Sequence, residues 1–216
     1  MIRIISQSPS VFNQYLAEIR DSVIQLDSMR FRTNMERMAA IMAFEISKQM
    51  DYENREVSTP LGVAEVPVLK SYPVLASILR AGLPMHRGLL SIFDRSENAF
   101  VSAYRKHRKD GSFSVQVEYV SGPELAGRYL ILADPMLATG SSLVLSYKAL
   151  LAKGKPIHTH IVTLIASVQG VDYLRKNLSQ DEVTLWVGAI DDELTAQAYI
   201  VPGLGDAGDL AFGSKI

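Results

Sequence analysis

The residues from Asp134 to Ser142 have the types and spacing that suit phosphate binding. They follow an apolar run at 129–133 and precede an amphipathic run at 141–153, an order that predicts a strand, a loop and a helix. Gly140 lets the backbone approach a ligand closely. The N–H groups that open the helix would face an anion, and the helix dipole favours negative charge at that end. The pattern therefore predicts that the protein binds a phosphorylated small molecule.

Side chains in this loop add to the backbone donors. Thr139, Ser141 and Ser142 carry hydroxyls that can donate to a phosphate. Asp134 would repel a phosphate, so we expect it to accept hydrogen bonds from sugar hydroxyls. The competing interpretation is an ordinary turn in which Ser141 or Ser142 caps the helix. Composition alone does not decide between these two interpretations.

Two other nucleotide-binding motifs do not hold. A P-loop needs Gly-Lys followed by Ser or Thr, but Gly154-Lys155 is followed by Pro156. The run from Gly203 to Gly208 matches the dinucleotide fingerprint letter for letter. Too few residues follow it for the helix and second strand of that unit, so we do not expect a dehydrogenase.

The elements around the phosphate-binding pattern predict an α/β fold. Apolar runs alternate with helical patterns, which is typical of a central, largely parallel sheet flanked by helices. Asp110-Gly111 is a hairpin turn signal between two of the strands. The strands are expected at residues 72–79, 99–104, 112–120, 129–133, 161–166 and 183–190, and the helices at residues 84–93, 141–153 and 170–177.

The first fifty or so residues are predicted to be helical and to pack on this sheet. Ser8-Pro9-Ser10 suits a helix start, and the helix is expected to run to about Leu26. A second helix should start near Asp27-Ser28, because the apolar residues after it recur at steps of four and three. An apolar β-hairpin arm is expected at Val57 to Val66. The apolar face of the second helix consists of Phe31, Met35, Met38, Met42 and Ile46.

Bulk composition narrows the class of protein. The chain has 216 residues, 48% of them apolar, which suits a single domain over residues 1–216 with a sizeable core. A formal net charge of -1 gives no overall field that favours nucleic acid or an anionic membrane. The absence of cysteine excludes disulfides and Cys-ligated metal sites. Residues 1–10 lack the apolar stretch of a signal peptide and no apolar run could span a bilayer, so we expect a cytoplasmic protein.

Three motifs, in order along the chain, resemble those of a known family. Asp134 to Ser142 resembles the phosphoribosyl diphosphate loop of type I phosphoribosyltransferases, and its string Asp-Pro-Met-Leu-Ala-Thr-Gly is similar to that of uracil phosphoribosyltransferases. Ile78 to Leu83 resembles the diphosphate loop of that family, and Tyr199 to Asp209 resembles its uracil-binding segment. Arg30-Phe31-Arg32 and Tyr104-Arg105 also fit, so the resemblance covers nearly the whole chain.

The resemblance implies a type I phosphoribosyltransferase fold and a transfer reaction. N1 of uracil would attack the anomeric carbon of 5-phosphoribosyl 1-diphosphate (PRPP), releasing diphosphate and forming UMP for pyrimidine salvage. Mg²⁺, bound mainly through PRPP, would help to neutralise the leaving diphosphate. The implied PRPP-binding residues are Arg80, Arg105, Asp134, Pro135, Met136, Leu137, Ala138, Thr139, Gly140, Ser141, Ser142 and Asp206. The implied uracil-binding residues are Ile200, Gly205, Asp206 and Ala207, and the implied catalytic residues are Asp206, Arg80 and Arg105.

Uracil presents an acceptor, a donor and an acceptor along one edge, which main-chain groups at Ile200 and at Gly205 to Ala207 could match. Cytosine carries an amino group where uracil has O4, so a donor would face a donor and cytosine would be rejected. Asp206 is expected near the reacting centre, where it would orient ribose or a magnesium-bound water. Asp206 and Asp209 are also common turn residues beside glycine, which is the interpretation favoured without the family resemblance.

Two clusters outside these motifs admit more than one interpretation. The basic run from Arg105 to Lys109 is either a solvated hairpin tip or a flap that closes over diphosphate. His158 and His160 share a strand face, but no third metal ligand is evident, so a sheet-edge position is expected instead. Trp186 is expected in the core.

The sequence departs from the family pattern at three positions and in one segment. Ser141 stands where the family usually has glycine, Arg87 where it has aspartate, and Leu210 where it has a basic residue. The segment from Asp191 to Ala198 also departs from the pattern, with Ala198 where glycine usually precedes Tyr199. These departures leave room for altered substrate affinity or lost regulation, and regulation by GTP stays open.

Two other functions stay open on the sequence alone. Some proteins with this fold regulate RNA in response to pyrimidine nucleotides, but that role needs an extended basic surface, and the near-neutral charge argues against it. The same chemistry on another base is the second alternative. The resemblance also suggests a homodimer or a larger homo-oligomer, with the arm at Val57 to Val66 as a contact.

Overall fold

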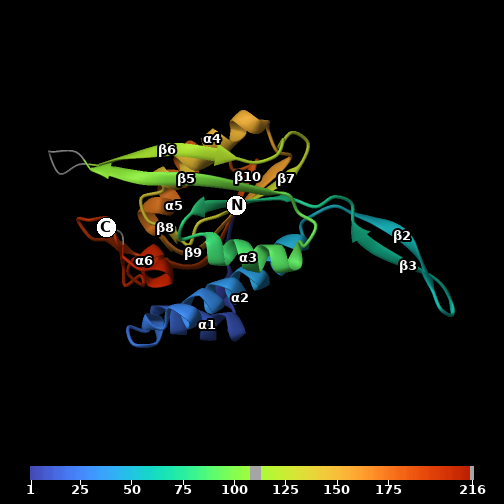
Figure 1. Cartoon of the computed structure of the whole chain (residues 1–216), viewed down its shortest axis with the longest axis horizontal. Coiled ribbons are helices and arrows are strands. Elements are labelled where there is room, and N and C mark those ends of the chain that lie inside the picture. Colours follow the sequence, from blue (N-terminus) through green and yellow to red (C-terminus); the bar gives the residue numbers. More distant parts are fainter. Residues whose placement is uncertain (108–112, 215–216) are drawn as a thin grey trace.

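The protein, seen here in a computed structural model, is built around one mostly parallel sheet (Figure 1). The structure describes the backbone of residues 1–107 and 113–214 and the side chains of residues 1–103 and 117–214. Within this described part the main sheet has eight strands, in the order β1-β10-β9-β7-β4-β5-β6 with β8 beside β9. Every neighbouring pair in it is parallel except β5 and β6. This is the predicted α/β architecture.

The strands are close to the predicted ones. The antiparallel pairing of β5 with β6 agrees with the predicted hairpin, whose Asp110-Gly111 turn lies outside the described residues. Two short strands, β1 and β8, were not predicted, because two or three residues show no periodicity. The bounds are β1 (Ile2–Ile4), β4 (Val74–Leu79), β5 (Asn98–His107), β6 (Phe113–Ser121), β7 (Tyr129–Ala133), β8 (Met136–Leu137), β9 (His158–Ser167) and β10 (Val183–Asp191).

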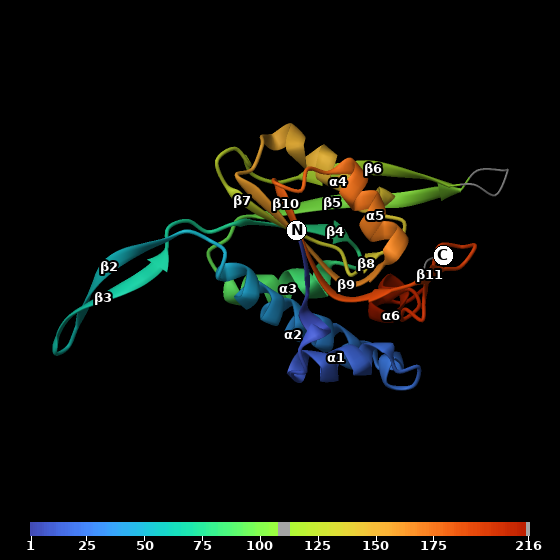
Figure 2. The ribbon, with the colours of Figure 1, turned by 180° about the vertical axis from the view of Figure 1, so that it is seen from behind.

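Helices cover both faces of the sheet (Figure 2). One face carries α1 (Val11–Arg20), α2 (Ser28–Ser47) and α3 (Leu83–Ile92), and the other carries α4 (Ser141–Leu150) and α5 (Val168–Asn177). No helix of the described residues is both long and apolar enough to cross a membrane.

Each face of the sheet has its own hydrophobic core. Side chains alternate along a strand, so β7 sends Ile131 and Ala133 into the core beneath α1, α2 and α3. Leu130 and Leu132 of the same strand pack in the core beneath α4 and α5. A sheet covered on both faces needs apolar residues at every strand position, which explains why these strands appear in the sequence as continuous apolar runs.

The N-terminal helices pack on the sheet as predicted, but the first is shorter than expected. α1 ends at Arg20 rather than near Leu26. The Asp21 carboxylate accepts hydrogen bonds from the N–H groups of Val23 and Ile24 at 2.8 and 2.9 Å, so a local turn replaces the next helical hydrogen bonds. The Met-rich face of α2 is confirmed as core. Its buried side chains are Phe31, Met35, Met38, Met42 and Ile46.

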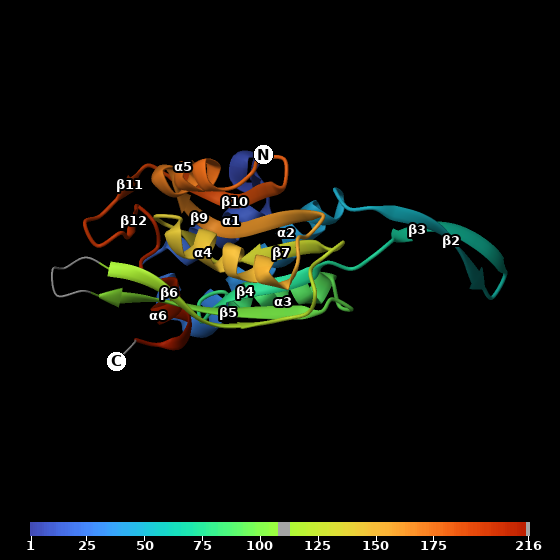
Figure 3. The same ribbon diagram turned by 90° about the horizontal axis from the view of Figure 1, so that it is seen from above.

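The predicted hairpin arm is present and longer than expected. β2 (Tyr52–Thr59) and β3 (Gly62–Leu69) form a separate antiparallel pair. The pair projects from the end of the sheet opposite α6 (Ala207–Phe212), as Figures 1 and 3 both show. Leu61 at its tip is 99% exposed. The arm therefore contributes little to the two cores of this chain.

His158 and His160 lie on an interior strand, so the predicted sheet-edge position was wrong. β9 runs between β10 and β7, an order set by tertiary pairing and not by any local pattern. Trp186, buried as predicted, donates from Nε1 to Nδ1 of His160 at 3.1 Å, and Nε2 of His158 lies 2.9 Å from Oγ1 of Thr184. Across the described side chains, no group of three His, Cys, Asp or Glu residues could hold a metal.

Candidate active site

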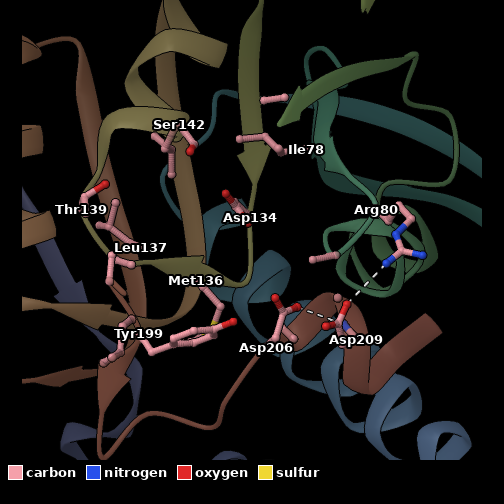
Figure 4. Close-up of a pocket in the computed structure, with 18 of the residues that line it drawn as sticks. Ile78, Arg80, Asp134, Met136, Leu137, Thr139, Ser142, Tyr199, Asp206 and Asp209 are labelled. Atoms are coloured by element: carbon pink, nitrogen blue, oxygen red, sulfur yellow. Dashed lines mark hydrogen bonds and ion pairs between the residues drawn. The ribbon is translucent and has the colours of Figure 1, made fainter. Parts of the chain in front are cut away.

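A cleft of about 730 Å³ opens at the carboxyl ends of β4, β7 and β8 (Figure 4). Three segments far apart in the sequence form its walls. They are the phosphate loop (residues 134–142), the Arg80 loop (residues 78–82) and the C-terminal loop (residues 197–209). The predicted site residues that line it are Arg80, Asp134, Met136, Leu137, Ala138, Thr139, Gly140, Ser142, Ile200, Gly205, Asp206 and Ala207.

The phosphate loop is anchored along its length to β9. The N–H of Asp134 donates to the carbonyl of Val162 at 3.1 Å, and the carbonyl of Pro135 accepts from the N–H groups of Leu164 and Ile165 at 3.0 and 3.1 Å. β8 then continues the pairing with β9. Pro135 is not among the residues that line the cleft, and its predicted contact with PRPP stays a prediction.

Gly140 turns the phosphate loop into α4. Its φ is +80°, in the left-handed region that favours glycine, and it occupies the position just before the first helical residue, Ser141. A β-carbon on Gly140 would lie 3.0 Å from both the carbonyl of Gly170 and the ring of Tyr173. The loop is therefore fitted closely against α5. The helix opens at the cleft, with its first N–H groups and its positive dipole end on that side.

The hydroxyls of the phosphate loop are not all equivalent. Oγ1 of Thr139 and Oγ of Ser141 lie 3.0 Å apart in a hydrogen bond. Thr139 and Ser142 line the cleft, whereas Ser141 does not. Ser141 is therefore hydrogen-bonded to Thr139 in this structure, and its predicted contact with the ligand stays a prediction.

The Arg80 loop brings a cation to the opposite wall of the cleft. The Arg80 guanidinium lies 3.6 Å from the Asp209 carboxylate and donates to the carbonyl of Gly213 at 3.3 Å. The side chain is 44% exposed, so it has room to move toward a bound anion. The Leu79–Arg80 peptide bond is cis, as is Val201–Pro202 in the C-terminal loop.

The C-terminal loop carries two carboxylates into the cleft. It is held at its base by a short antiparallel pair, β11 (Glu193–Leu194) and β12 (Ile200–Val201). Asp206 caps α6, because its carboxylate accepts the N–H of Asp209 at 2.9 Å. Asp209 in turn pairs with Arg80, as the dashed lines of Figure 4 show. An ion pair therefore connects the Arg80 loop with the C-terminal loop.

The comparison with known families shows to which family the chain belongs. A family model described as uracil phosphoribosyltransferase matches residues 5–214. The chain belongs to the uracil phosphoribosyltransferase family. The resemblance inferred from the three motifs is thereby confirmed over nearly the whole chain.

Curated relatives agree with this assignment. The chain is 54% identical to a uracil phosphoribosyltransferase of Porphyromonas gingivalis over 207 residues, which cover 96% of this chain and 95% of the relative. It is 35% identical to a uracil phosphoribosyltransferase of Pyrococcus furiosus over 206 residues, which cover 94% of this chain and 86% of the relative.

Solved structures agree on the fold. A protein of Aquifex aeolicus superposes over 100% of both chains with a TM-score of 0.87 and 26% sequence identity. The orotate phosphoribosyltransferase of Mycobacterium tuberculosis, solved in complex with PRPP, has a TM-score of 0.53 at 11% identity and covers 85% of this chain and 91% of that chain. This second likeness shows that the predicted type I phosphoribosyltransferase fold is correct.

Further residues of this uracil phosphoribosyltransferase family member line the cleft although none was assigned an individual role from the sequence. Among them are Gln197, Ala198, Tyr199 and Asp209. The sequence gave no sign of the ion pair that Asp209 makes, because aspartate beside glycine is also common in ordinary turns. Ala198 had a signal, because the family usually has glycine there. Its φ is 61°, and within the described backbone no other non-glycine residue has a positive φ.

Arg105 is the predicted site residue whose side chain lies outside the described part. Its backbone belongs to β5, two positions after Ala103, which lines the cleft. The rest of the basic run, up to Lys109, is likewise outside the described side chains, so the choice between hairpin tip and flap stays a prediction.

Two departures from the family pattern have structural partners in this chain. Arg87 lies 3.8 Å from Glu36 in an exposed ion pair between α3 and α2, so its changed charge meets an opposite charge at the surface. Leu210 packs against the core beneath α2, where a basic residue would have to reach solvent. Neither side chain lines the cleft.

Proposed function

We propose that this protein transfers the 5-phosphoribosyl group of PRPP to N1 of uracil, forming UMP and releasing diphosphate. One observation carries the proposal: three distant motifs meet in one cleft, in a chain that belongs to the uracil phosphoribosyltransferase family. We also propose that residues 1–216 act as a single phosphoribosyltransferase domain.

The phosphate loop is suited to the 5-phosphate and ribose of PRPP. The phosphate would bind at the start of α4, where backbone N–H groups, the helix dipole and the hydroxyls of Thr139 and Ser142 converge on the cleft. Asp134, directly after β7, would accept hydrogen bonds from the ribose hydroxyls. This division keeps the carboxylate away from the phosphate charge.

The Arg80 loop is suited to the leaving diphosphate. Transfer from the anomeric carbon builds positive charge on the sugar and negative charge on the leaving group, so positioning and electrostatics matter more than a strong base. Arg80 and Arg105 would neutralise the diphosphate. Asp206 would lie near the reacting centre and orient ribose or a magnesium-bound water.

The described carboxylates fit a Mg²⁺ that enters with the substrate. Asp134 and Asp206 present the oxygen ligands that Mg²⁺ prefers, and Mg²⁺ commonly binds through one or two carboxylates together with phosphate oxygens. We therefore propose that Mg²⁺ binds mainly through PRPP. Its contribution when bound is to neutralise charge on the diphosphate.

The C-terminal loop is suited to uracil. Main-chain groups of Ile200 and of Gly205 to Ala207 would match the acceptor, donor and acceptor edge of the base. A buried donor facing the amino group of cytosine would be left unpaired, so discrimination against cytosine should be large. Tyr199 and Met136 also line this cleft and add apolar surface for a flat base.

We further propose that the active form is a homo-oligomer built on a dimer. The arm of β2 and β3 exposes Leu61, Val63 and Val66, and none of these three side chains packs against either core. An isolated two-stranded hairpin is only marginally stable in water, and exposed apolar side chains often mark a surface that another protein covers. We propose that a second copy of this chain covers these side chains.

A substrate-panel assay tests the proposed function. Purified protein is incubated with PRPP, Mg²⁺ and one base at a time: uracil, cytosine, hypoxanthine or orotate. We expect diphosphate release with uracil alone, and none when Mg²⁺ or the base is omitted. Release with another base at an equal or higher rate would reassign the substrate. Adding GTP in parallel measures whether that nucleotide regulates the reaction.

A further inference from the structure

A buried ion pair lies behind the C-terminal loop, outside the cleft. Arg20 is the last residue of α1, and Asp191 is the last residue of β10. The guanidinium and the carboxylate meet through two contacts of 2.7 and 2.8 Å, a forked geometry. The Asp191 side chain is only 7% exposed and that of Arg20 is 22% exposed. Neither side chain lines the cleft.

Both members of the pair also hold one residue of the C-terminal loop, Gly203, by its N–H and its carbonyl. Oδ2 of Asp191 accepts the N–H of Gly203 at 2.9 Å, and Nη1 of Arg20 donates to the carbonyl of Gly203 at 2.9 Å. Gly203 has a φ of +55°, and a β-carbon there would lie 2.1 Å from the carbonyl of Ile200. The pair therefore fixes a tight turn that only glycine can make.

Gly203 lies in the middle of the segment that is proposed to bind uracil. Ile200 lies three residues before it and Gly205 two residues after it, and both residues line the cleft. A base read by main-chain groups is recognised only if those groups are held in place, because a displacement of about 1 Å can abolish useful contacts. The turn at Gly203 sets the relative position of the two halves.

We infer that Arg20 and Asp191 are positioning residues for nucleobase recognition. They act through Gly203 and hold the two halves of the C-terminal loop at the separation that uracil requires. This inference rests on the proposed function, since it assigns the loop to the base. It makes a prediction that a general stabilising role does not make: loss of the pair should raise the KM for uracil much more than the KM for PRPP.

The neighbouring strand supplies a matched anchor for the other ligand loop. Ser167, the last residue of β9, is the register partner of Asp191 on β10. Its hydroxyl donates to the carbonyl of Ala138 in the phosphate loop at 2.6 Å and accepts the N–H of Gly170 at 2.8 Å. The end of β10 thus anchors the C-terminal loop, which is proposed to bind uracil. The end of β9 anchors the phosphate loop, which is proposed to bind PRPP.

The chain also contains a control ion pair of the same chemistry. Glu18 on α1 pairs with Arg30 on α2 through two contacts of 2.9 Å and accepts from Asn34 at 2.7 Å. This pair joins helices and touches neither loop. Glu18→Gln therefore measures what the loss of a forked ion pair near the C-terminus of α1 does to stability alone.

The experiment measures steady-state kinetics and thermal unfolding for four variants beside the wild type. They are Asp191→Asn, Arg20→Lys, Ser167→Ala and Glu18→Gln. Asp191→Asn keeps the shape but turns an amide donor toward Arg20, and Arg20→Lys keeps the charge but loses the fork. We expect both to raise the KM for uracil by about tenfold or more with the KM for PRPP within about twofold, as for the loss of a hydrogen bond to a charged group.

The other two variants define the specificity of that effect. Ser167→Ala should show the reverse pattern, a raised KM for PRPP with an unchanged KM for uracil. Glu18→Gln should lower the unfolding temperature without changing either KM. In the double variant Arg20→Lys with Asp191→Asn, the KM for uracil should rise no further than in the worse single variant, because two residues that act as a unit are not additive.

Equal changes of both KM values in Asp191→Asn and Arg20→Lys, or no change of either in folded variants, would overturn the inference while the proposed function stands. If the wild type released no diphosphate with any of the four bases, the proposed function would be overturned, and this inference with it. If Asp191→Asn does not fold, Arg20→Lys decides by the same split between the two KM values.

Discussion

At the scale of single residues, Asp206 has two roles that can be separated. Its carboxylate caps α6 by accepting the N–H of Asp209, and it also lines the cleft where the reaction is proposed to occur. Asparagine caps a helix about as well as aspartate, whereas alanine does not. The two substitutions therefore remove different roles.

We predict that Asp206→Asn loses about a hundredfold or more in kcat while its unfolding temperature stays close to that of the wild type. Asp206→Ala should lose similar activity and, in addition, about 1 kcal/mol of stability with the cap. Steady-state kinetics and urea unfolding measure the two quantities. Near-normal turnover in Asp206→Asn would leave the carboxylate with a structural role only.

His160 makes the stability of this chain depend on pH. Burial lowers the pKa of its imidazole to about 3, and the neighbouring His158 adds to the effect. In the unfolded chain a histidine titrates near pH 6.5, as the model peptides do. Between these two values the unfolded chain binds a proton that the folded chain refuses, so stability must fall as pH falls through this window.

We expect the free energy of unfolding to drop by about 1.4 kcal/mol per pH unit from this group alone between pH 6 and pH 4. His160→Gln keeps an acceptor for the Trp186 N–H but cannot titrate, so its profile should be flatter by that amount. Urea unfolding at several pH values provides the comparison. Parallel profiles for the two proteins would show that His160 does not titrate as proposed.

At the scale of elements, the phosphate loop depends on how it enters α4. Gly140 adopts a left-handed conformation and is confined by Gly170 and Tyr173 of α5. Gly127 has a similar φ of +72°, but a β-carbon there would meet no atom within 4 Å. The two glycines share the backbone requirement and differ in their surroundings.

We predict that Gly140→Ala and Gly127→Ala each lose about 1–2 kcal/mol of stability from the left-handed backbone. Gly140→Ala alone should also raise the KM for PRPP by about tenfold, because its β-carbon must displace the loop from α5. Kinetics with PRPP as the varied substrate measure this effect. The prediction is wrong if the two variants have the same KM for PRPP.

Local patterns were sufficient to predict the long elements. Continuous apolar runs gave β7 and most of β9 and β10, and the steps of four and three gave the buried face of α2. The end of α1 was wrong because a single side chain, Asp21, diverts the backbone. The interior position of β9 was missed because strand order depends on pairing between distant segments, which no local pattern records.

Only part of the site could be predicted from the sequence, because local patterns do not record contacts between distant segments. Asp134 and Gly140 were predicted from their residue types and their place after a strand, whereas Asp206 was predicted only through the family resemblance. The Arg80–Asp209 ion pair and the turn that Asp191 holds at Gly203 join residues far apart in the sequence. Such contacts need the fold, so the sequence left Asp209 between the uracil-binding segment and turn chemistry, and it gave Asp191 no role beyond opening a segment that departs from the family pattern.

At the scale of the whole molecule, the arm projects from the end of the sheet opposite α6 (Figure 3), and residues of α6 line the cleft. We predict that replacing residues 56–65 by Asn-Gly, which joins the register pair Arg55 and Val66 through a tight turn, reduces the assembly to monomers. Light scattering after size-exclusion chromatography measures the mass. An assembly of unchanged mass would show that the arm is not the contact.

The parallel order of the sheet is what brings the three loops together. The carboxyl ends of parallel strands meet at one edge, so the loops after β4 and β7 share a wall with the segment that follows β10. The arrangement puts a phosphate-binding helix start, a cation and a main-chain recognition segment around one space. The family assignment and the cleft geometry thus support the same transfer reaction.

The most direct test of that reaction is to follow labelled uracil into product. Wild-type protein is incubated with PRPP, Mg²⁺ and radiolabelled uracil, and the nucleotide and diphosphate formed are quantified by chromatography. We expect the label to appear in UMP in equal amount to the diphosphate released, and only when all three components are present. A protein that leaves the label in free uracil, beside a related active enzyme assayed under the same conditions, would contradict the proposed function.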